Sequence, residues 1–231
     1  MSILHDNLCS DVQNVISTQW NTRKGHVVPS TSDVALAGGA VELSATFLYA
    51  DMANSSKMAK ELDRRVAAKI LKAFLASTTR LIKFHGGSIA SFDGDRVMGI
   101  FVGDSKNSSA AKCGLQIKYL VQDIIRPKFE NAYSSVKNAS FTINHGTGID
   151  TGTVLAVRAG ARGANDLIWI GRAPNLAAKL SDLRSSPYST WITASVYNCL
   201  NDKSKYGGDG KNMWEARTWT FLGESKSVFR S

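Results

Sequence analysis

From about residue 40 onward, the apolar residues alternate between strand-like and helix-like spacing. The stretch VELSATFLYA (residues 41–50) predicts a strand, and apolar residues from Met58 to Ile82 recur at helical spacing. A hairpin around Asp93-Gly94-Asp95 and a helix from about Ser108 that closes at Arg126-Pro127 follow. Strands are then predicted within residues 139–160 and 166–171, a helix over residues 173–183, and a mixed segment over residues 190–200. The order βαββαβ, with additions, predicts an α+β fold in which helices pack on one antiparallel sheet.

The first 40 residues have a different pattern. Leu4, Leu8, Val12, Val15 and Ile16 predict a short amphipathic helix, and the polar segment NTRKGHVVPSTSD (residues 21–33) predicts a linker. We therefore expect residues 1–40 to be an N-terminal extension packed on one main domain, residues 41–231.

Composition excludes several classes of protein. A chain of 231 residues that is 43% hydrophobic can bury one sizeable core, so disorder is not expected. Its longest apolar runs fall well short of the roughly 18 residues that a bilayer span needs, and the N-terminus has no leader-like pattern. We expect a cytoplasmic protein without a membrane partner. The cysteines, Cys9, Cys113 and Cys199, have no CxxC spacing, which favours reduced packing residues over a disulfide framework or a zinc site.

The net charge of +9 favours an anionic partner. Nucleic acid and a nucleotide both fit that charge. The basic residues are scattered along predicted helices, as in KELDRRVAAKILK, instead of forming a basic run of the nucleic-acid type, so we expect no nucleic-acid partner.

Two acidic positions stand at the ends of predicted strands. Asp51 follows an apolar strand, and Asp95 lies in the turn of the predicted hairpin. Two carboxylates about 4 Å apart repel by roughly 4 kcal/mol at an effective dielectric of 20, so a cation between them is expected. Mg²⁺ or Mn²⁺ fits, because these ions prefer oxygen ligands and share them with phosphates. The alternative makes Asp51 a helix N-cap and Asp95 a plain turn residue.

Two further segments carry candidate binding groups. The small polar residues after Asp51 lead into a helix whose first N–H groups can hold a phosphate, although a simple cap has the same sequence. On the predicted helix over residues 173–183, Asn175 and Lys179 lie four positions apart and hence on one face, where they can hold a ribose and a charged phosphate. A solvated polar stripe is the alternative.

Four ordered stretches together resemble the catalytic domain of class III nucleotidyl cyclases: FLYADMANSS, FDGDRVMGIF, GTGIDTGTVLAV and IGRAPNLAAKL. The resemblance covers about residues 43–200 and implies a ferredoxin-like βαββαβ core. It also implies a homodimer with sites at a head-to-tail interface, each holding two Mg²⁺ or Mn²⁺ ions. The implied site residues are the metal ligands Asp51, Asp95 and the carbonyl of Met52, the triphosphate turn Asn54, Ser55 and Ser56, the ribose ligand Asn175, and Lys179, where the family usually has an arginine that stabilises the transition state.

Two departures bear on the base. Purine cyclases commonly have a lysine at the position of Ser91 and an aspartate at that of Ile168, so a purine pocket is not expected here. With the N-terminal segment, this is similar to the bacterial pyrimidine cyclases of antiphage defence, which make cyclic UMP or cyclic CMP. Tyr49, on the same strand face as Asp51, can hydrogen-bond a pyrimidine or serve as an ordinary strand aromatic.

The predicted function is conversion of UTP to cyclic UMP and pyrophosphate by two-metal intramolecular phosphoryl transfer, narrowly favoured over the use of CTP. The remaining alternatives are an adenylate or guanylate cyclase, a catalytically inactive cyclase-like domain, and a nucleic-acid-binding protein suggested by charge alone. Lys226 is a candidate phosphate ligand whose register against the family is open.

Overall fold

A single mixed sheet organises the chain in the computed structural model, which describes residues 2–184 and 186–231. Its main path runs in the order β3-β4-β2-β5-β7-β9-β8, while β1 pairs with β2 and β6 pairs with β5. The strands are β1 (Asn21–Lys24), β2 (Gly39–Met52), β3 (Ser88–Asp93), β4 (Arg96–Phe101), β5 (His145–Ala161), β6 (Ala164–Ile170), β7 (Thr190–Thr193), β8 (Glu215–Phe221) and β9 (Glu224–Arg230). The pairs β2–β4, β3–β4, β5–β6, β7–β9 and β8–β9 are antiparallel, and β1–β2 and β5–β7 are parallel.

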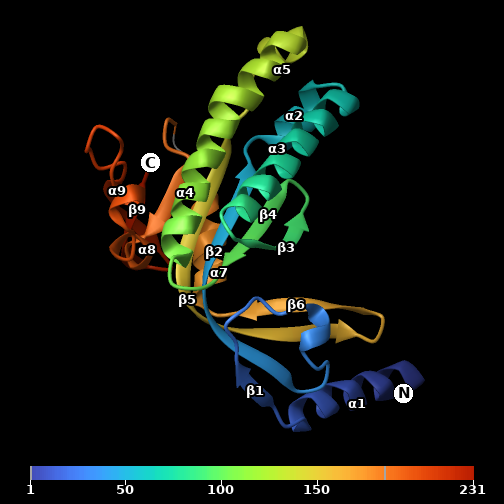
Figure 1. The fold of residues 1–231 in the computed structure, drawn as a ribbon. Coiled ribbons are helices and arrows are strands. Elements are labelled where there is room, and N and C mark those ends of the chain that lie inside the picture. Colours follow the sequence, from blue (N-terminus) through green and yellow to red (C-terminus); the bar gives the residue numbers. More distant parts are fainter. Residues whose placement is uncertain (1, 185) are drawn as a thin grey trace. The chain divides into compact units, whose positions relative to one another are not determined.

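The helices connect and cover these strands (Figure 1). They are α1 (Ile3–Ser17), α2 (Ser55–Glu61), α3 (Arg64–Phe84), α4 (Lys106–Tyr119), α5 (Arg126–Ala132), α6 (Ser134–Lys137), α7 (Arg172–Ser181), α8 (Ala194–Asn198) and α9 (Asp202–Lys205), with a 3₁₀ turn η1 (Thr31–Asp33) and a π-helical segment η2 (Leu120–Ile125). The succession β2-α3-β3-β4-α4-β5, with the sheet order β3-β4-β2-β5, confirms the predicted α+β fold with a βαββαβ core.

The main core lies where α3 and α4 cover one face of the sheet. Long apolar side chains that alternate along β2, such as Leu48 and Met52, meet Ile70 and Phe74 of α3 and Ile117 of α4 there. All five are almost fully buried. Burial of this kind contributes about 1.5–3 kcal/mol for each large apolar side chain, so this face holds the fold together.

Two helix predictions need correction. The predicted helix around Met58–Ile82 is two helices, because Asp63 caps α3 by accepting a hydrogen bond from the Arg65 N–H (2.9 Å), which starts a new helix after α2. The predicted end at Arg126-Pro127 is also wrong. The helical path continues from α4 through η2 into α5, and Pro127 stands in the first turn of α5.

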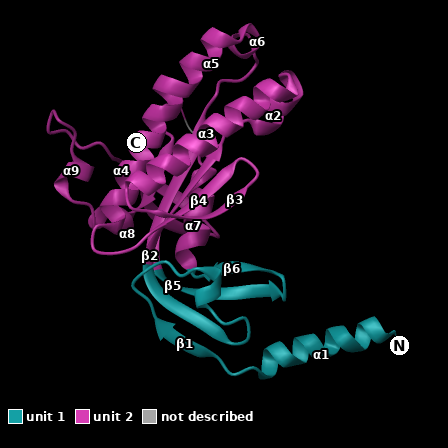
Figure 2. Cartoon of the chain, turned by 45° about the vertical axis from the view of Figure 1, so that its right-hand side comes forward, with its two compact units in different colours: residues 1–44, 153–171 teal, residues 45–152, 172–231 magenta. Residues whose placement is uncertain are grey.

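The chain divides into two compact units (Figure 2). One comprises residues 1–44 and 153–171, and the other residues 45–152 and 172–231. The sequence did not indicate that residues 153–171 group with the N-terminal segment. The extent predicted for the main domain, residues 41–231, stays a prediction.

The unit made of residues 1–44 and 153–171, called the N-terminal unit below, does not contain the predicted linker. Residues 21–24 form β1, which pairs in parallel with residues 39–42 of β2. A polar sequence can form such a strand because the pairing uses backbone groups only. The predicted helix is confirmed as α1, but α1 buries none of its residues, and its large apolar side chains are 54–81% exposed, in contrast to the packing expected.

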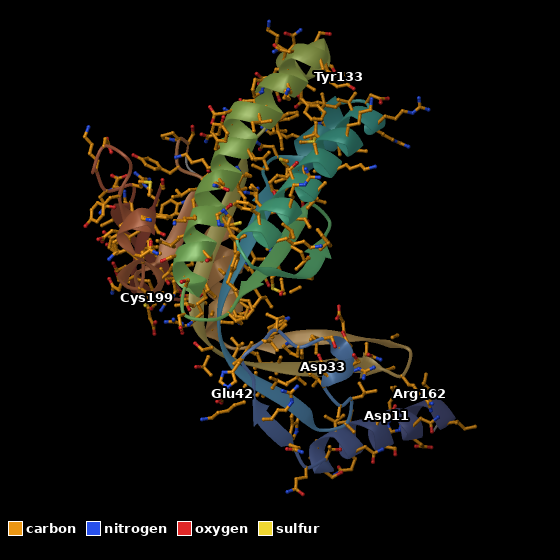
Figure 3. The ribbon with its side chains drawn as sticks, viewed as in Figure 1. Asp11, Asp33, Glu42, Tyr133, Arg162 and Cys199 are labelled. Atoms are coloured by element: carbon orange, nitrogen blue, oxygen red, sulfur yellow. The ribbon has the colours of Figure 1, made fainter. Side chains whose placement is uncertain are left out.

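The cysteines are free thiols. Cys113 is buried in the main core as predicted, and burial raises the pKa of its thiol. Cys9 and Cys199 are exposed, so the packing role predicted for them is wrong; Cys199 is labelled in Figure 3. Within the described ranges, no helix is both long enough and apolar enough to cross a membrane.

Candidate active site

The register of β2 and β4 brings the two predicted metal ligands to one end of the sheet. Asp51 stands opposite Arg96, and the Met52 N–H donates to the carbonyl of Asp95 (3.3 Å). Asp95 lies in the tight hairpin turn, where Gly94 takes a positive φ of 58°. Asp51 is a strand residue and not a helix cap, since Asn54 occupies the N-cap of α2.

This strand end offers an oxygen-rich donor set. Two carboxylates and the Met52 carbonyl suit Mg²⁺ or Mn²⁺ and do not suit softer metals. Among residues 2–184 and 186–231, no cluster of three His, Cys, Asp or Glu side chains exists that could hold a metal. A cation here would therefore need backbone, water or phosphate oxygens to complete its coordination, which is usual for Mg²⁺.

Asp51 is buried, with 5% of its surface exposed, and two arginines neutralise it. Its Oδ2 accepts hydrogen bonds from Arg96 (3.1 Å) and from Arg184, which follows α7. The same guanidinium nitrogen of Arg96 donates to Oδ1 of Asp182 (3.0 Å). Burial opposes the charge of Arg96, but Asp51 and Asp182 outweigh it and raise the pKa of Arg96. Sequence reasoning missed Arg96, Arg184 and Asp182 altogether.

Tyr49 and Ser91 share the sheet face that carries Asp51. Tyr49 of β2 and Ser91 of β3 both pair with Met98 of β4, and paired residues point to the same face of the sheet. Asp51 lies two positions after Tyr49 on β2, so its side chain points to that face as well. Tyr49 is half-buried, and Arg96 lies 6.0 Å from the centre of its ring. Burial raises the pKa of the Tyr49 phenol, which keeps its hydroxyl able to donate as well as accept.

The predicted triphosphate turn joins β2 to α2. Asn54 takes a left-handed conformation (φ 61°, ψ 24°), and the preceding Ala53 N–H donates to the Asn144 carbonyl (2.8 Å). Ser55 is half-buried and Ser56 is exposed. The turn is thus fixed at its base and open toward solvent along its first helical residues.

Two glycines of β5 set the position of α7. A Cβ on Gly148 would lie 2.1 Å from the Ala177 carbonyl oxygen, and one on Gly146 would lie 2.0 Å from that of Ser181. Only a residue without a side chain permits this approach of helix to strand. The contact places α7 on the face of β5 opposite Ile149, which belongs to the main core.

The α7 helix presents both predicted groups to solvent. Asn175 and Lys179 are exposed and lie one turn apart. Lys179 Nζ lies 3.9 Å from Oδ2 of Asp182, the carboxylate that also binds Arg96. Within one chain, Asp182 and Arg96 therefore connect the predicted transition-state lysine with the predicted metal ligand Asp51.

A second buried carboxylate, Asp150, was not predicted. It is fully buried; its Oδ1 accepts from the Thr193 hydroxyl (2.5 Å), and its Oδ2 lies 3.5 Å from Nε of Arg172 at the start of α7. Burial raises the pKa of Asp150, and the Thr193 hydrogen bond opposes this. Asp150 lies in the stretch GTGIDTGTVLAV, but the sequence analysis gave it no role.

The two remaining predicted residues are Ile168 and Lys226. Ile168, in β6, belongs to the N-terminal unit and is 45% exposed, so its position is defined within that unit. Lys226, in β9, pairs with Glu224 (2.7 Å). Lys226 also lies close enough to Asp150 for its charge to lower the pKa of that carboxyl.

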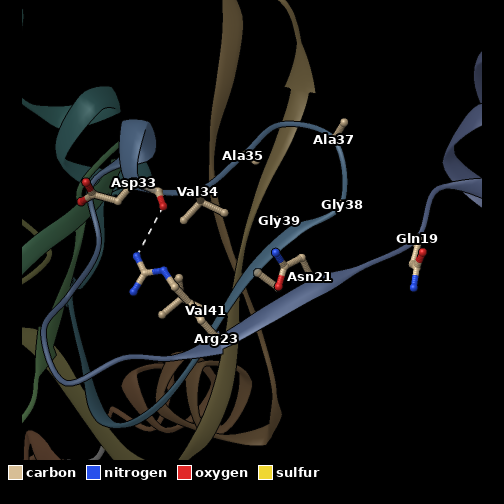
Figure 4. A pocket seen from close by; sticks show the side chains of 11 residues that line it. Gln19, Asn21, Arg23, Asp33, Val34, Ala35, Ala37, Gly38, Gly39 and Val41 are labelled. Atoms are coloured by element: carbon tan, nitrogen blue, oxygen red, sulfur yellow. Dashed lines mark hydrogen bonds between the residues drawn. The ribbon is translucent and has the colours of Figure 1, made fainter.

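The N-terminal unit contains a hollow of about 370 Å³ (Figure 4). It is lined by residues 33–35 and 37–41, together with Gln19, Asn21 and Arg23. Arg23 donates to the carbonyl of Asp33 (3.4 Å) across one side of it. None of the predicted site residues lines this hollow.

Solved structures define the class of this fold. The chain is similar to the adenylyl cyclase CyaB from P. aeruginosa (TM-score 0.68, 18% identity, 83% of this chain and 94% of that one). It is also similar to the guanylyl cyclase Cya2 (TM-score 0.66, 18% identity, 82% and 90%). The fold is that of a class III cyclase domain.

Sequence relatives refine this class. The chain is 59% identical to a uridylate cyclase of Rhodovulum sp. (strain MB263) over 229 residues, which span 99% of this chain and 95% of that protein. It is 42% identical to a uridylate cyclase of Xanthomonas perforans over 99% of this chain and 96% of that protein. No family model matches the chain. The chain belongs to the uridylate cyclase family and is a nucleotidyl cyclase.

Proposed function

We propose that this cyclase converts UTP to 3′,5′-cyclic UMP and pyrophosphate. Full-length identity of 59% to a uridylate cyclase carries the proposal. The absence of the two purine-reading side chains, at Ser91 and Ile168, supports it, because a site without matching polar groups discriminates poorly in favour of a purine. Tyr49, next to Asp51 on the same face, is the proposed contact to the pyrimidine ring.

Asp51, Asp95 and the Met52 carbonyl are the proposed ligands of two Mg²⁺ or Mn²⁺ ions. When bound, these ions would lower the pKa of the ribose 3′ hydroxyl and neutralise the leaving pyrophosphate. The bond formed joins the 3′ oxygen to the α-phosphorus, and the bond broken is the one from that phosphorus to the oxygen of the departing pyrophosphate. The 3′ proton leaves to solvent.

The remaining proposed roles belong to this chain's own side chains. Asn54, Ser55 and Ser56 hold the triphosphate, and Asn175 orients the ribose. Lys179 balances the charge that grows on the α-phosphate. As a point charge, it lacks the two-pronged geometry that arginine offers to a phosphate.

A product assay tests the reaction. Purified protein is incubated separately with UTP, CTP, ATP and GTP in Mn²⁺, and products are identified by mass spectrometry. Cyclic UMP at the highest kcat/KM supports the proposal. Cyclic CMP at a higher kcat/KM would instead make the chain a cytidylate cyclase, and no product from any nucleotide would identify an inactive cyclase-like domain.

We also propose a homodimer whose sites combine Asp51 and Asp95 of one chain with Asn175 and Lys179 of the other. Exposure of both α7 side chains supports this arrangement. Mixing Asp51→Asn chains with Lys179→Ala chains tests it. Random re-pairing should restore about a quarter of wild-type activity, since half of the dimers then contain one intact site. No recovery on mixing would mean that each site is built within one chain.

The proposed role of the product is that of a second messenger in antiphage defence. Cells that express the wild-type chain with its genomic neighbours should resist phage infection, and cells with Asp51→Asn should not. Equal plaque counts in the two strains would contradict this role.

A further inference from the structure

The side chain of Asp51 carries an unusual load of positive charge. Its Oδ2 accepts from two guanidinium groups, those of Arg96 and Arg184, which come from positions 45 and 133 residues away in the sequence. The carboxylate side chain is 6% exposed, and the arginine side chains are 28% and 33% exposed. One negative charge therefore faces two positive charges in a largely water-excluded place.

This arrangement conflicts with a divalent cation at the same oxygen. A metal ligated by Oδ2 would stand within a few ångströms of both guanidinium groups, and like charges at that range repel strongly where solvent is excluded. Oδ2 cannot serve a metal and both arginines together. At least one arginine has to leave Oδ2 when a metal binds that oxygen.

We propose that Arg96 and Arg184 form a guanidinium clamp on Asp51 that a divalent cation displaces, and that this clamp sets the metal affinity of the site. This inference rests on the proposed metal-binding function of Asp51. Arg96 and Arg184 are thus positioning residues that act through the carboxylate.

The two arginines are not equivalent in the clamp. Arg96 keeps an acceptor when it leaves Asp51, because the same nitrogen already donates to Asp182 (3.0 Å). Asp51 is the ion-pair partner found for Arg184 within the described residues. Displacing Arg184 is therefore the larger obstacle to metal binding, and its removal should have the larger effect.

Direct binding of Mn²⁺ alone, followed by the paramagnetic resonance of the free ion, tests the clamp without any turnover. Arg184→Gln should lower the Kd for Mn²⁺ by about 3- to 10-fold, since a hydrogen-bonded charge no longer competes for the carboxylate. Arg96→Gln should lower it by a smaller factor. The matched control is Arg80→Gln, on an exposed position of α3, which removes the same charge away from the strand end and should leave the Kd unchanged.

The direction of the change separates this proposal from its rivals. An arginine that only supports the local structure would weaken Mn²⁺ binding when removed. One that only binds the triphosphate would leave the Kd for Mn²⁺ unchanged and raise KM for UTP. Either result for Arg184→Gln overturns the clamp.

Asp51→Asn separates the clamp from the function beneath it. If wild-type protein binds Mn²⁺ and Asp51→Asn does not, the metal site stands whatever Arg184→Gln does. If wild-type and Asp51→Asn bind Mn²⁺ equally, the metal site and the clamp fail together. Thermal melting of each variant checks that the fold is retained.

Discussion

The two faces of β2 carry different kinds of side chain near the end of the strand. Leu48, Ala50 and Met52 point into the core under α3 and α4, whereas Tyr49 and Asp51 point to the opposite face. The core face is closed by apolar contacts that depend on shape. At the end of the strand, the other face carries charge, where two arginines bind one buried carboxylate. One strand can therefore supply both core packing and a proposed metal ligand, because successive side chains leave a strand on opposite sides.

The strongest test of this division is at the strand end itself. Asp51→Asn and Asp95→Asn should each lower kcat by more than about 1000-fold, since a neutral amide is a poor ligand for Mg²⁺ or Mn²⁺. Turnover at saturating Mn²⁺ and UTP measures the loss, and circular dichroism checks the fold. Activity near wild type in either variant would contradict the metal assignment.

Lys179, in α7, tests the other side of the proposed site. Lys179→Ala should lower kcat by about 100- to 1000-fold, the usual cost of losing one preorganised charge donor. KM for UTP should change far less, because the charge on the phosphate grows in the transition state. Lys179→Arg is the matched variant and should retain most of the activity; an equally large loss there would argue against a purely electrostatic role.

The glycines of β5 test whether packing, and not charge, positions α7. Gly148→Ala should lower the free energy of unfolding by about 1–3 kcal/mol, because its Cβ would meet the Ala177 carbonyl at 2.1 Å and α7 must move. It should also lower kcat, since α7 carries Asn175 and Lys179. On the same strand face, Gly152→Ala serves as the control: its Cβ meets Ala173 at an ordinary 3.6 Å. Equal stability of the two variants would contradict this reading of α7.

The main core contains a group that lowers stability at low pH, His145 at the start of β5. His145 is fully buried beside Phe74, and burial, reinforced by nearby Arg126, lowers the pKa of its imidazole to about 3. The unfolded chain takes up this proton near pH 6.5 and the folded chain does not, so stability is full above pH 6.5 and falls as the pH drops toward 3.

Urea unfolding at a series of pH values measures this contribution. Replacing His145 by Leu should make the fall in stability between pH 6 and pH 4 shallower by about 1.4 kcal/mol per pH unit. His26→Gln, at an exposed position, should leave the slope unchanged. A slope in His145→Leu equal to that of wild type would place the acid sensitivity elsewhere.

Local patterns in the sequence carried the prediction of the fold. The end of β2 at Met52, the turn at Gly94 and the one-turn spacing of Asn175 and Lys179 are each encoded within about fifteen residues. Periodicity and turn chemistry act over that range, so these elements could be predicted. The order of elements then left few ways to arrange the core strands.

Contacts between distant segments could not be predicted in this way. Nothing in the sequence separates Arg96 and Arg184 from the other Lys and Arg residues, 28 in all, because an ion pair leaves no local pattern. The parallel pairing of β1 with β2 could not be predicted either, because only backbone groups make it and they leave no pattern in the sequence. The helical path through Pro127 continues directly from the π-helical segment η2, although proline usually ends a helix.

The sequence by itself determined the local setting of each proposed site group: Asp51 at a strand end, Asp95 in a hairpin turn, and Asn175 and Lys179 on one helix face. The tertiary structure decided which side chains those groups contact. Asp51 binds Arg96 and Arg184, and Arg96 also binds the carboxylate of Asp182. The physical reason is range. Backbone preferences act between near neighbours in the chain, whereas charge acts between near neighbours in space.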